Sequence, residues 1–217
     1  MKPEAPPPAK VPAKPPYWDR AKRALGRRDS ILGAIMRAHP KVYMAQRGEP
    51  FFTLARAIVG QQISVKAAQS VWDRFTACVQ NVTPQSVLAV SRAELRACGF
   101  SERKVEYVAD LAQHFVDGRI HVHRWPEMDD EAIIAELVEV RGIGRWTAEM
   151  FLMFNLLRPD VFPLDDLGLQ RGIRLAYFKG RQVSAARMRR LAETWRPWRS
   201  VATWYLWRSL DPVPVEY

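Results

Sequence analysis

The 217-residue sequence has little of several features that would mark particular protein classes. It contains two cysteines, Cys78 and Cys98, too few for a disulfide scaffold or for a zinc or iron–sulfur site built from four thiolates. No apolar run approaches the roughly 18 residues of a membrane span, and Asn155 interrupts the longest one, 150–157. The Pro- and Lys-rich N-terminus lacks the apolar stretch of a secretory signal. These absences favour a protein of the reducing cytoplasm.

Acidic residues are outnumbered by basic ones. The sequence has 33 Lys and Arg against 23 Asp and Glu, a formal net charge of +10. An excess of this size is typical of a protein with a polyanionic partner, although a basic protein with solvated arginine faces would also have it. Arg dominates over Lys in the second half, and a guanidinium can form two parallel hydrogen bonds to a phosphate. Charge alone therefore leaves both interpretations open.

The sequence also lacks the alternation of apolar and polar residues that is typical of strands, and its periodic segments have the spacing of helices. Apolar residues recur every three or four positions in segments such as 51–60 and 105–115, and Pro or Gly often flanks such segments. Ser91, with Glu94 three positions later, has the pattern of a helix capping box. We predict an all-α fold of about ten short helices in a non-bundle arrangement. A disordered basic, Pro-rich tail is predicted at 1–16.

The stretch RGIGRWTAEM places two glycines two positions apart between helical segments. Gly142 and Gly144 tolerate positive φ values and allow another backbone to come close, while Ile143 between them can pack the two helices together. The next helix begins at Arg145 or Trp146, so its first amides point out of the turn and can bind an anion such as phosphate. A tight helical hairpin without a ligand is the alternative, and Gly-x-Gly alone favours it.

Further along, VFPLDD ends in two adjacent carboxylates, Asp165 and Asp166. Apolar neighbours can restrict hydration and hold a carboxylate near a reaction centre. The segment that follows has a helical pattern, so an aspartate at this position is also a good N-cap. Both roles fit if one aspartate caps the helix and the other faces a cleft.

Together, LVEVRGIGRWTAEMF and VFPLDDLGLQR resemble the helix-hairpin-helix, Gly/Pro-rich-loop, Asp superfamily of DNA glycosylases, and within it most closely the alkylpurine (3-methyladenine) DNA glycosylase II branch. The resemblance extends over about residues 17–217 and includes RAIVGQQISVKAA, LRACGFSERKVEYVADLA and WRPWRSVATWYLWRSL. It implies a two-lobed, all-α enzyme with a helix-hairpin-helix motif. One lobe, 51–165, would carry the wedge loop and the hairpin, and the other would combine 17–50 with 166–217.

The resemblance also implies roles for individual residues. Asp166 matches the catalytic aspartate, and Gln62, beside Gln61 in the GQQIS loop, matches the wedge that fills the gap left by a flipped base. The hairpin would bind DNA phosphate at four residues: Gly142, Gly144, Arg145 and Thr147. The flipped base would lie in a pocket where Trp146 and Trp207 match family positions. Met150 and Tyr205, which is near Trp207 in the sequence, are expected to line it as well. A structural Na⁺ or K⁺ would be held by three backbone carbonyls: Val138, Val140 and Ile143.

Trp146 stands where bifunctional relatives carry a Schiff-base lysine, so the implied enzyme is monofunctional and leaves an abasic site. A fixed carboxylate would stabilise the positive charge that develops on the sugar, with no cofactor for the chemistry. Aromatic faces attract electron-poor bases, which favours alkylated purines such as 3-methyladenine and 7-methylguanine. Met150 replaces a Tyr of a close relative, which leaves the pocket shape open.

Other functions remain open: a glycosylase for uracil, mismatched or oxidised bases, a non-catalytic DNA-binding hairpin protein, or a basic scaffold protein. A pure DNA binder would not need a carboxylate that repels phosphate. The implied partner is double-stranded DNA containing damaged bases. We expect a monomer with no membrane association, in the cytoplasm of a bacterium and associated with the nucleoid.

Overall fold

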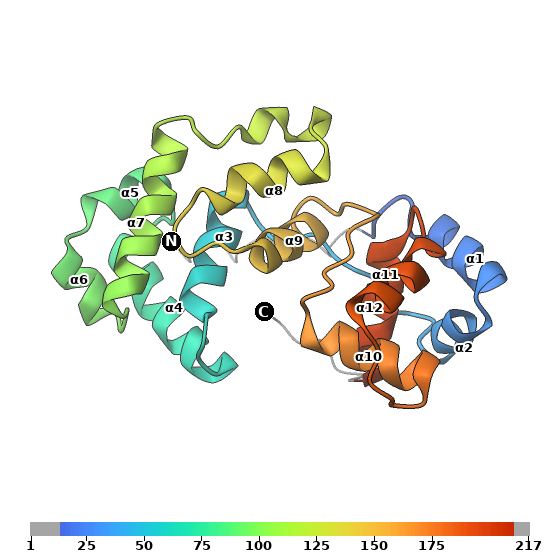
Figure 1. Ribbon diagram of the computed structural model, residues 1–217. Coiled ribbons are helices and arrows are strands. Elements are labelled where there is room, and N and C mark those ends of the chain that lie inside the picture. Colours follow the sequence, from blue (N-terminus) through green and yellow to red (C-terminus); the bar gives the residue numbers. More distant parts are fainter. Residues whose placement is uncertain (1–13, 211–217) are drawn as a thin grey trace, which may run out of the picture.

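The computed structural model describes residues 14–210, and this part of the chain folds into helices without any strand (Figure 1). The predicted all-α class is confirmed. None of the helices found in this part has the length and apolar character needed to cross a membrane. The elements are α1 (Trp18–Arg28), α2 (Ser30–Ala38), α3 (Pro50–Gly60), α4 (Val65–Val79), α5 (Pro84–Ala89), α6 (Arg92–Ala97), α7 (Glu102–Val116), the 3₁₀ helix η1 (Val122–Glu127), α8 (Asp130–Val138), α9 (Arg145–Phe154), α10 (Leu167–Phe178), α11 (Ala185–Glu193) and α12 (Arg199–Leu210).

Two groups of helices lie on either side of α9 (Figure 1). In the first group α3 packs on α4 and α7, α5 packs on α7, and α8 packs on α9. In the second group α1, α2 and α10 all contact α12. Helices from the beginning and the end of the described chain therefore build one side of the molecule together. The boundaries proposed for two lobes, 51–165 and 17–50 with 166–217, stay a prediction.

The ends of the helices follow the capping chemistry of the sequence. Ser91 accepts a hydrogen bond from the N–H of Glu94, and the Glu94 carboxylate accepts one from the N–H of Ser91. Most of the tail predicted at 1–16 lies outside the described residues. Pro15, however, is buried, and its carbonyl oxygen accepts a hydrogen bond from the N–H of Trp18 at 2.9 Å. The folded part therefore begins earlier than predicted.

The close packing of α10 on α12 depends on two glycines that lie one turn apart. A Cβ at Gly172 would stand 3.2 Å from the carbonyl oxygen of Leu206. A Cβ at Gly168 would stand 3.1 Å from Oδ1 of Asp166 and 3.4 Å from the ring of Trp207. Because both positions lack a side chain, α12 can approach α10 closely. The approach brings Trp207 beside the first turn of α10.

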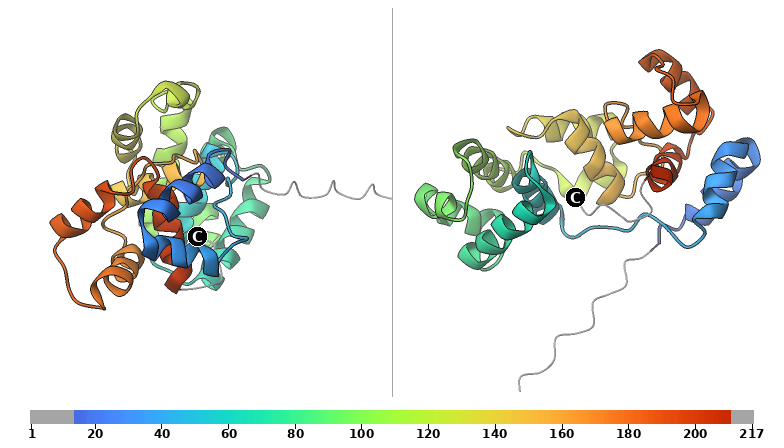
Figure 2. Two further views of the ribbon diagram at one scale, coloured as in Figure 1. Left: turned by 90° about the vertical axis from the view of Figure 1, so that its right-hand side faces the viewer. Right: turned by 90° about the horizontal axis from the view of Figure 1, so that it is seen from below.

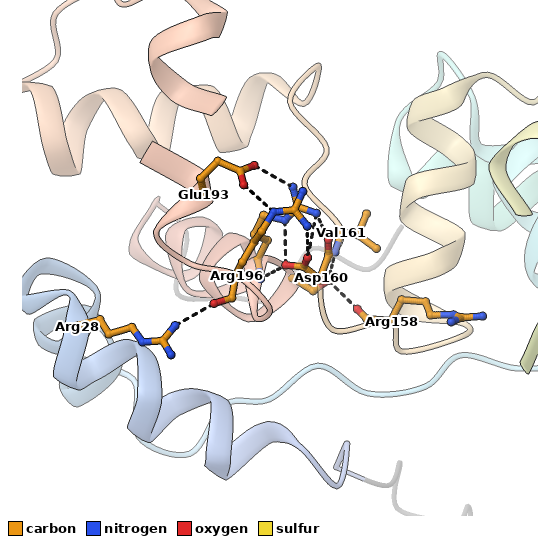
Figure 3. A network of polar contacts seen from close by, with 8 residues as sticks. Arg28, Arg158, Asp160, Val161, Glu193 and Arg196 are labelled. Carbon is orange, nitrogen blue, oxygen red and sulfur yellow. Dashed lines mark hydrogen bonds and ion pairs between the residues drawn. The ribbon is translucent and has the colours of Figure 1, made fainter. Parts of the chain in front are cut away.

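A polar network anchors the segment between α9 and α10 (Figure 3). Asp160 accepts a hydrogen bond from Nε of Arg199 at 2.9 Å. The buried hydroxyl of Ser200 donates to the carbonyl oxygen of Arg158 at 2.6 Å and accepts from the N–H of Val161 at 2.9 Å. These bonds tie the segment that leads into α10 to the first turn of α12.

Ser200→Ala should lower the free energy of unfolding by about 1 to 3 kcal/mol, because the buried N–H of Val161 loses its acceptor. Ser209, exposed on the same helix, gives a matched control, and Ser209→Ala should change stability by no more than about 0.5 kcal/mol. Urea unfolding followed by circular dichroism measures both changes. Equal losses in the two variants would show that the anchoring bonds of Ser200 add nothing to stability.

Candidate active site

The carboxylate of Asp166 receives hydrogen bonds from N–H groups of three different helices. Its Oδ1 accepts from the backbone N–H of Leu169 in α10 at 2.6 Å and from Nε1 of Trp207 in α12 at 2.9 Å. Its Oδ2 accepts from Nε1 of Trp146 in α9 at 3.0 Å. The side chain is half-buried, so the carboxylate is held in one orientation and still borders solvent.

Asp166 is also the N-cap of α10. One aspartate of the pair does cap the helix, and it is the candidate catalytic residue itself, while Asp165 lines an open groove. Asp165 is exposed. Sequence reasoning also passed over Leu167, whose side chain is 76% exposed directly after Asp166. It places an apolar group at the surface beside the carboxylate.

Helix α9 is apolar on two sides, and one of them faces the candidate site. Trp146, Met150 and Phe154 follow one another at intervals of one turn, so they share a side of the helix. The ring of Phe154 stacks on Trp207, with ring centroids 6.0 Å apart and an interplanar angle of 18°. Leu152 on another side is fully buried in the core, so α9 is apolar nearly all the way round. Trp146 and Trp207 meet at Asp166, with Met150 one turn along.

Tyr205 does not join this group, which corrects its prediction as a pocket residue. Its side chain is fully buried, and its hydroxyl donates a hydrogen bond to the carbonyl oxygen of Val42 at 3.2 Å. Its ring lies 5.9 Å from that of Trp18 in α1. Residues two positions apart on a helix point about 200° apart around the axis. Since Trp207 faces Asp166, Tyr205 faces the core.

The two glycines of the hairpin have different roles. Gly142 has a φ of +85°, and a Cβ there would lie 2.3 Å from the ring of Tyr107. The fold itself therefore requires glycine at this position. Gly144 is the N-cap of α9 and is exposed, and nothing lies within 4 Å of the place where its Cβ would stand. Open space next to the first amides of α9, which include that of Thr147, suits an approaching anion.

Helix α7 supports the hairpin and the neighbouring end of α3 with residues that sequence reasoning missed. Asp110 accepts a hydrogen bond from the backbone N–H of Arg141 at 2.9 Å, and Tyr107 packs against the turn. Lys104 donates to the carbonyl oxygen of Val59 at 2.6 Å, and burial lowers the pKa of its ammonium group. The three supporting side chains are spaced by three positions. This spacing is common to any amphipathic helix, so the sequence carries no specific signal for the role.

The two glutamines of the GQQIS loop have different surroundings. Gln62 is exposed at the tip of the loop with a φ of +59°, and its role as a wedge stays a prediction. Gln61 turns back, and its Nε2 donates a hydrogen bond to the carbonyl oxygen of Gly142 at 2.8 Å. The prediction that Gln61 shares the wedge is therefore corrected. Gln61 links the wedge loop to the hairpin.

The guanidinium of Arg145 points toward acidic side chains. Its Nη1 donates to Glu131 at 2.8 Å and its Nε donates to Glu149 at 3.1 Å. Burial raises the pKa of Glu149 to about 7, and Arg145 opposes this rise. The side chain of Arg145 is thus paired within the protein, and its part in the phosphate site stays a prediction. The backbone amide of Arg145 stays in the predicted phosphate site.

The carbonyls predicted to hold a monovalent cation lie at the end of α8 and in the hairpin. The carbonyl oxygen of Val140 accepts a hydrogen bond from the N–H of Ile143 at 3.0 Å, and a carbonyl oxygen has a second lone pair for a cation. Val138 ends α8 and is 39% exposed. Within residues 14–210, no group of three or more His, Cys, Asp or Glu side chains could hold a metal ion.

Residues 55–197 match the family described as HhH-GPD superfamily base excision DNA repair protein, and the chain belongs to this family. Among its relatives is DNA-3-methyladenine glycosylase 1 of Schizosaccharomyces pombe, which is 34% identical over 168 residues, 76% of this chain and 74% of that protein. DNA-3-methyladenine glycosylase 2 of Escherichia coli is 30% identical over 199 residues, 87% of this chain and 67% of that protein.

Solved structures of such proteins have the same fold. A DNA-3-methyladenine glycosidase from Bacillus halodurans superposes with a TM-score of 0.81 at 32% identity, covering 93% of this chain and 92% of that chain. A 3-methyladenine DNA glycosylase of S. pombe in complex with abasic DNA superposes with a TM-score of 0.76 at 29% identity, covering 90% of this chain and 100% of that chain.

The contrast between the two hairpin glycines can be measured. Gly142→Ala should lower the free energy of unfolding by about 1 to 3 kcal/mol, because the methyl group meets Tyr107 at a positive φ. Gly144→Ala should leave stability within about 0.5 kcal/mol but weaken binding to undamaged duplex DNA, because its methyl group stands where a phosphate would approach. Urea unfolding and fluorescence anisotropy separate the two effects. Wild-type affinity in Gly144→Ala would argue against the phosphate site.

Proposed function

We propose that this chain is a monofunctional DNA glycosylase that hydrolyses the N-glycosidic bond of alkylated purines, such as 3-methyladenine and 7-methylguanine, in base excision repair. The observation that carries the proposal is the half-buried carboxylate of Asp166, held by two indole N–H groups and one backbone N–H. Membership of a base excision repair family supports it.

The geometry suits this reaction because breaking the bond to the base builds positive charge on the sugar. A carboxylate that is already fixed by Trp146, Leu169 and Trp207 can stabilise that charge without reorganising. The target base lies out of reach inside a duplex, so it must first be flipped out. An exposed Gln62 can fill the gap, while the amides of the hairpin hold the backbone.

An alkylated purine is the substrate that needs least help from the protein. Alkylation at N3 or N7 makes the base cationic, so it leaves readily without a general acid. The carboxyl of Glu149, whose pKa burial raises to about 7, is not available as such an acid, because it accepts a hydrogen bond from Arg145. The indoles of Trp146 and Trp207 offer the faces that attract a cationic base. The names of the S. pombe and E. coli relatives point to the same substrate class.

We also propose that the protein acts as a monomer on double-stranded DNA, in the cytoplasm of a bacterium and at the nucleoid. No cofactor would take part in the chemistry. A Na⁺ or K⁺ bound by the carbonyls of Val138, Val140 and Ile143 would brace the hairpin where it meets the DNA backbone.

Asp166→Asn keeps the shape of the side chain and removes its charge, so release of 3-methyladenine from methylated DNA should fall roughly a hundredfold or more. Binding to a duplex with an abasic site should be retained. Asp165→Asn, at the exposed neighbour, is the matched control and should stay close to the wild type. Chromatography of the released bases measures all three proteins, beside duplexes containing uracil or 8-oxoguanine.

Near-normal turnover in Asp166→Asn would remove this residue from the reaction. Release of uracil or 8-oxoguanine without any methylpurine would replace the proposed substrate and leave the role of Asp166 intact. The two failures are therefore distinguishable in one set of measurements.

The proposal of a monofunctional enzyme predicts that no imine forms with the sugar. Within the described residues, the groups that hydrogen bond to the carboxylate of Asp166 are two indoles and a backbone amide, and none is an amine. Borohydride added during the reaction should trap no protein–DNA adduct, and strand scission should need added base or heat. An efficiently trapped adduct would establish lyase activity instead.

A further inference from the structure

The segment that follows the candidate catalytic aspartate has an unusual charge distribution. Residues 167–192 contain no Asp or Glu. The same 26 positions carry seven basic residues on α10, α11 and the connection between them: Arg171, Arg174, Lys179, Arg181, Arg187, Arg189 and Arg190. All except Arg174 are exposed. In a chain with 23 acidic residues, their exclusion from this segment leaves a purely positive region.

The seven cations form no ion pair with any residue in the described part of the chain. Arginines elsewhere do so, as in the pair of Arg199 with Asp160. In the basic segment, Arg174 donates a hydrogen bond to Gln182 at 3.1 Å, and the guanidinium of Arg187 lies 4.8 Å from the ring centroid of Phe178. Like charges that stay unneutralised repel one another, and a polyanion relieves this repulsion.

One of the seven faces a different neighbourhood. Arg189 lines an open groove of about 870 Å³, together with other arginines and with the carboxylates of Asp129, Glu131, Asp160 and Glu193. Because carboxylates surround it there, Arg189 is left out of the basic surface. The other six residues define the α10–α11 basic surface: Arg171, Arg174, Lys179, Arg181, Arg187 and Arg190.

The position of the basic surface relative to Asp166 follows from α10. This helix starts at its N-cap Asp166 and is 12 residues long, so its far end lies about 18 Å from the carboxylate. In the right-hand view of Figure 2, α10 runs outward from the region of α9, and α11 lies beyond it. Each strand of duplex DNA carries a phosphate about every 3.4 Å along the helix axis. The surface therefore begins at Arg171, within the first two turns after Asp166, and the part at the far end of α10 lies about five base pairs from a nucleotide held at Asp166.

We propose that the α10–α11 basic surface is a second contact with the DNA backbone, separate from the hairpin, which binds phosphates on one flank of the flipped nucleotide. This inference rests on the proposed function for the placement of that nucleotide at Asp166. Contacts of Lys and Arg with phosphates supply affinity and register without reading sequence. The surface thus fixes the orientation of the duplex, and the hairpin and wedge act on the damaged position.

The test compares two variants of the full chain that lose the same charge. The surface variant removes exposed cations whose side chains form no hydrogen bond, ion pair or ring contact in the described part of the chain: Arg171→Gln, Arg181→Gln and Arg190→Gln. The control variant removes exposed cations from α1 and α2: Arg23→Gln, Arg27→Gln and Arg37→Gln. Unfolding midpoints equal to that of the wild type establish that both variants are folded.

The probe is a duplex with a tetrahydrofuran abasic-site analogue, which fixes the register, and affinity is read by fluorescence anisotropy over a range of salt concentrations. Each phosphate contact contributes about 0.9 to the slope of log affinity against log salt, so the surface variant should lose about 2 to 3 from the wild-type slope. The control variant should keep the wild-type slope. Shortening the duplex on one flank should weaken wild-type binding more than shortening the other, and the surface variant should lose this asymmetry.

Equal slope losses in the two variants would overturn the proposal, because net charge alone would then explain the effect. An unchanged asymmetry in the surface variant would overturn it as well. Release of methylpurines is scored in a separate assay. Asymmetric, salt-dependent binding without methylpurine release would refute the proposed substrate and leave the basic surface standing.

Discussion

The orientation of one carboxylate depends on helices that are far apart in the sequence. Asp166 is held by N–H groups of α9, α10 and α12, and each donor reaches it only while its helix stays in place. Gly168 and Gly172 allow α12 to come close enough for Trp207 to donate. The bonds of Ser200 secure the segment that enters α10. The orientation of the Asp166 carboxylate therefore depends mainly on the packing of the helices and less on the loop that carries it.

Much of the fold could be predicted because the signals for it are local. Helix periodicity and the capping pair of Ser91 and Glu94 act within one or two turns, and the structure bears both out. The meeting of Trp146 with Asp166 was predictable in a different way, through motifs whose order and spacing resemble a known family. A local pattern alone left Asp166 with a choice between capping and catalysis, and the structure gives it the capping bond as well as the position in the site.

The remaining features depend on contacts that a local pattern does not contain. Gln61 and Gly142 are 81 positions apart, so nothing in GQQIS indicates which glutamine turns back. Nearness in sequence to Trp207 does not place Tyr205 near it in space, because a helix sends side chains two positions apart to opposite sides. Tyr107 gives no signal beyond an amphipathic helix, yet its ring fills the space that a side chain at Gly142 would need.

The bond from Gln61 to the carbonyl oxygen of Gly142 has a mechanical consequence under the proposed function. This hydrogen bond links the loop tip with Gln62 to the hairpin, so a displacement of one segment is passed to the other. The grip of the hairpin on the DNA backbone and the insertion of Gln62 would then act on the same part of the duplex. The spacing between these two contacts is thus set by the folded protein and does not have to form anew on the DNA.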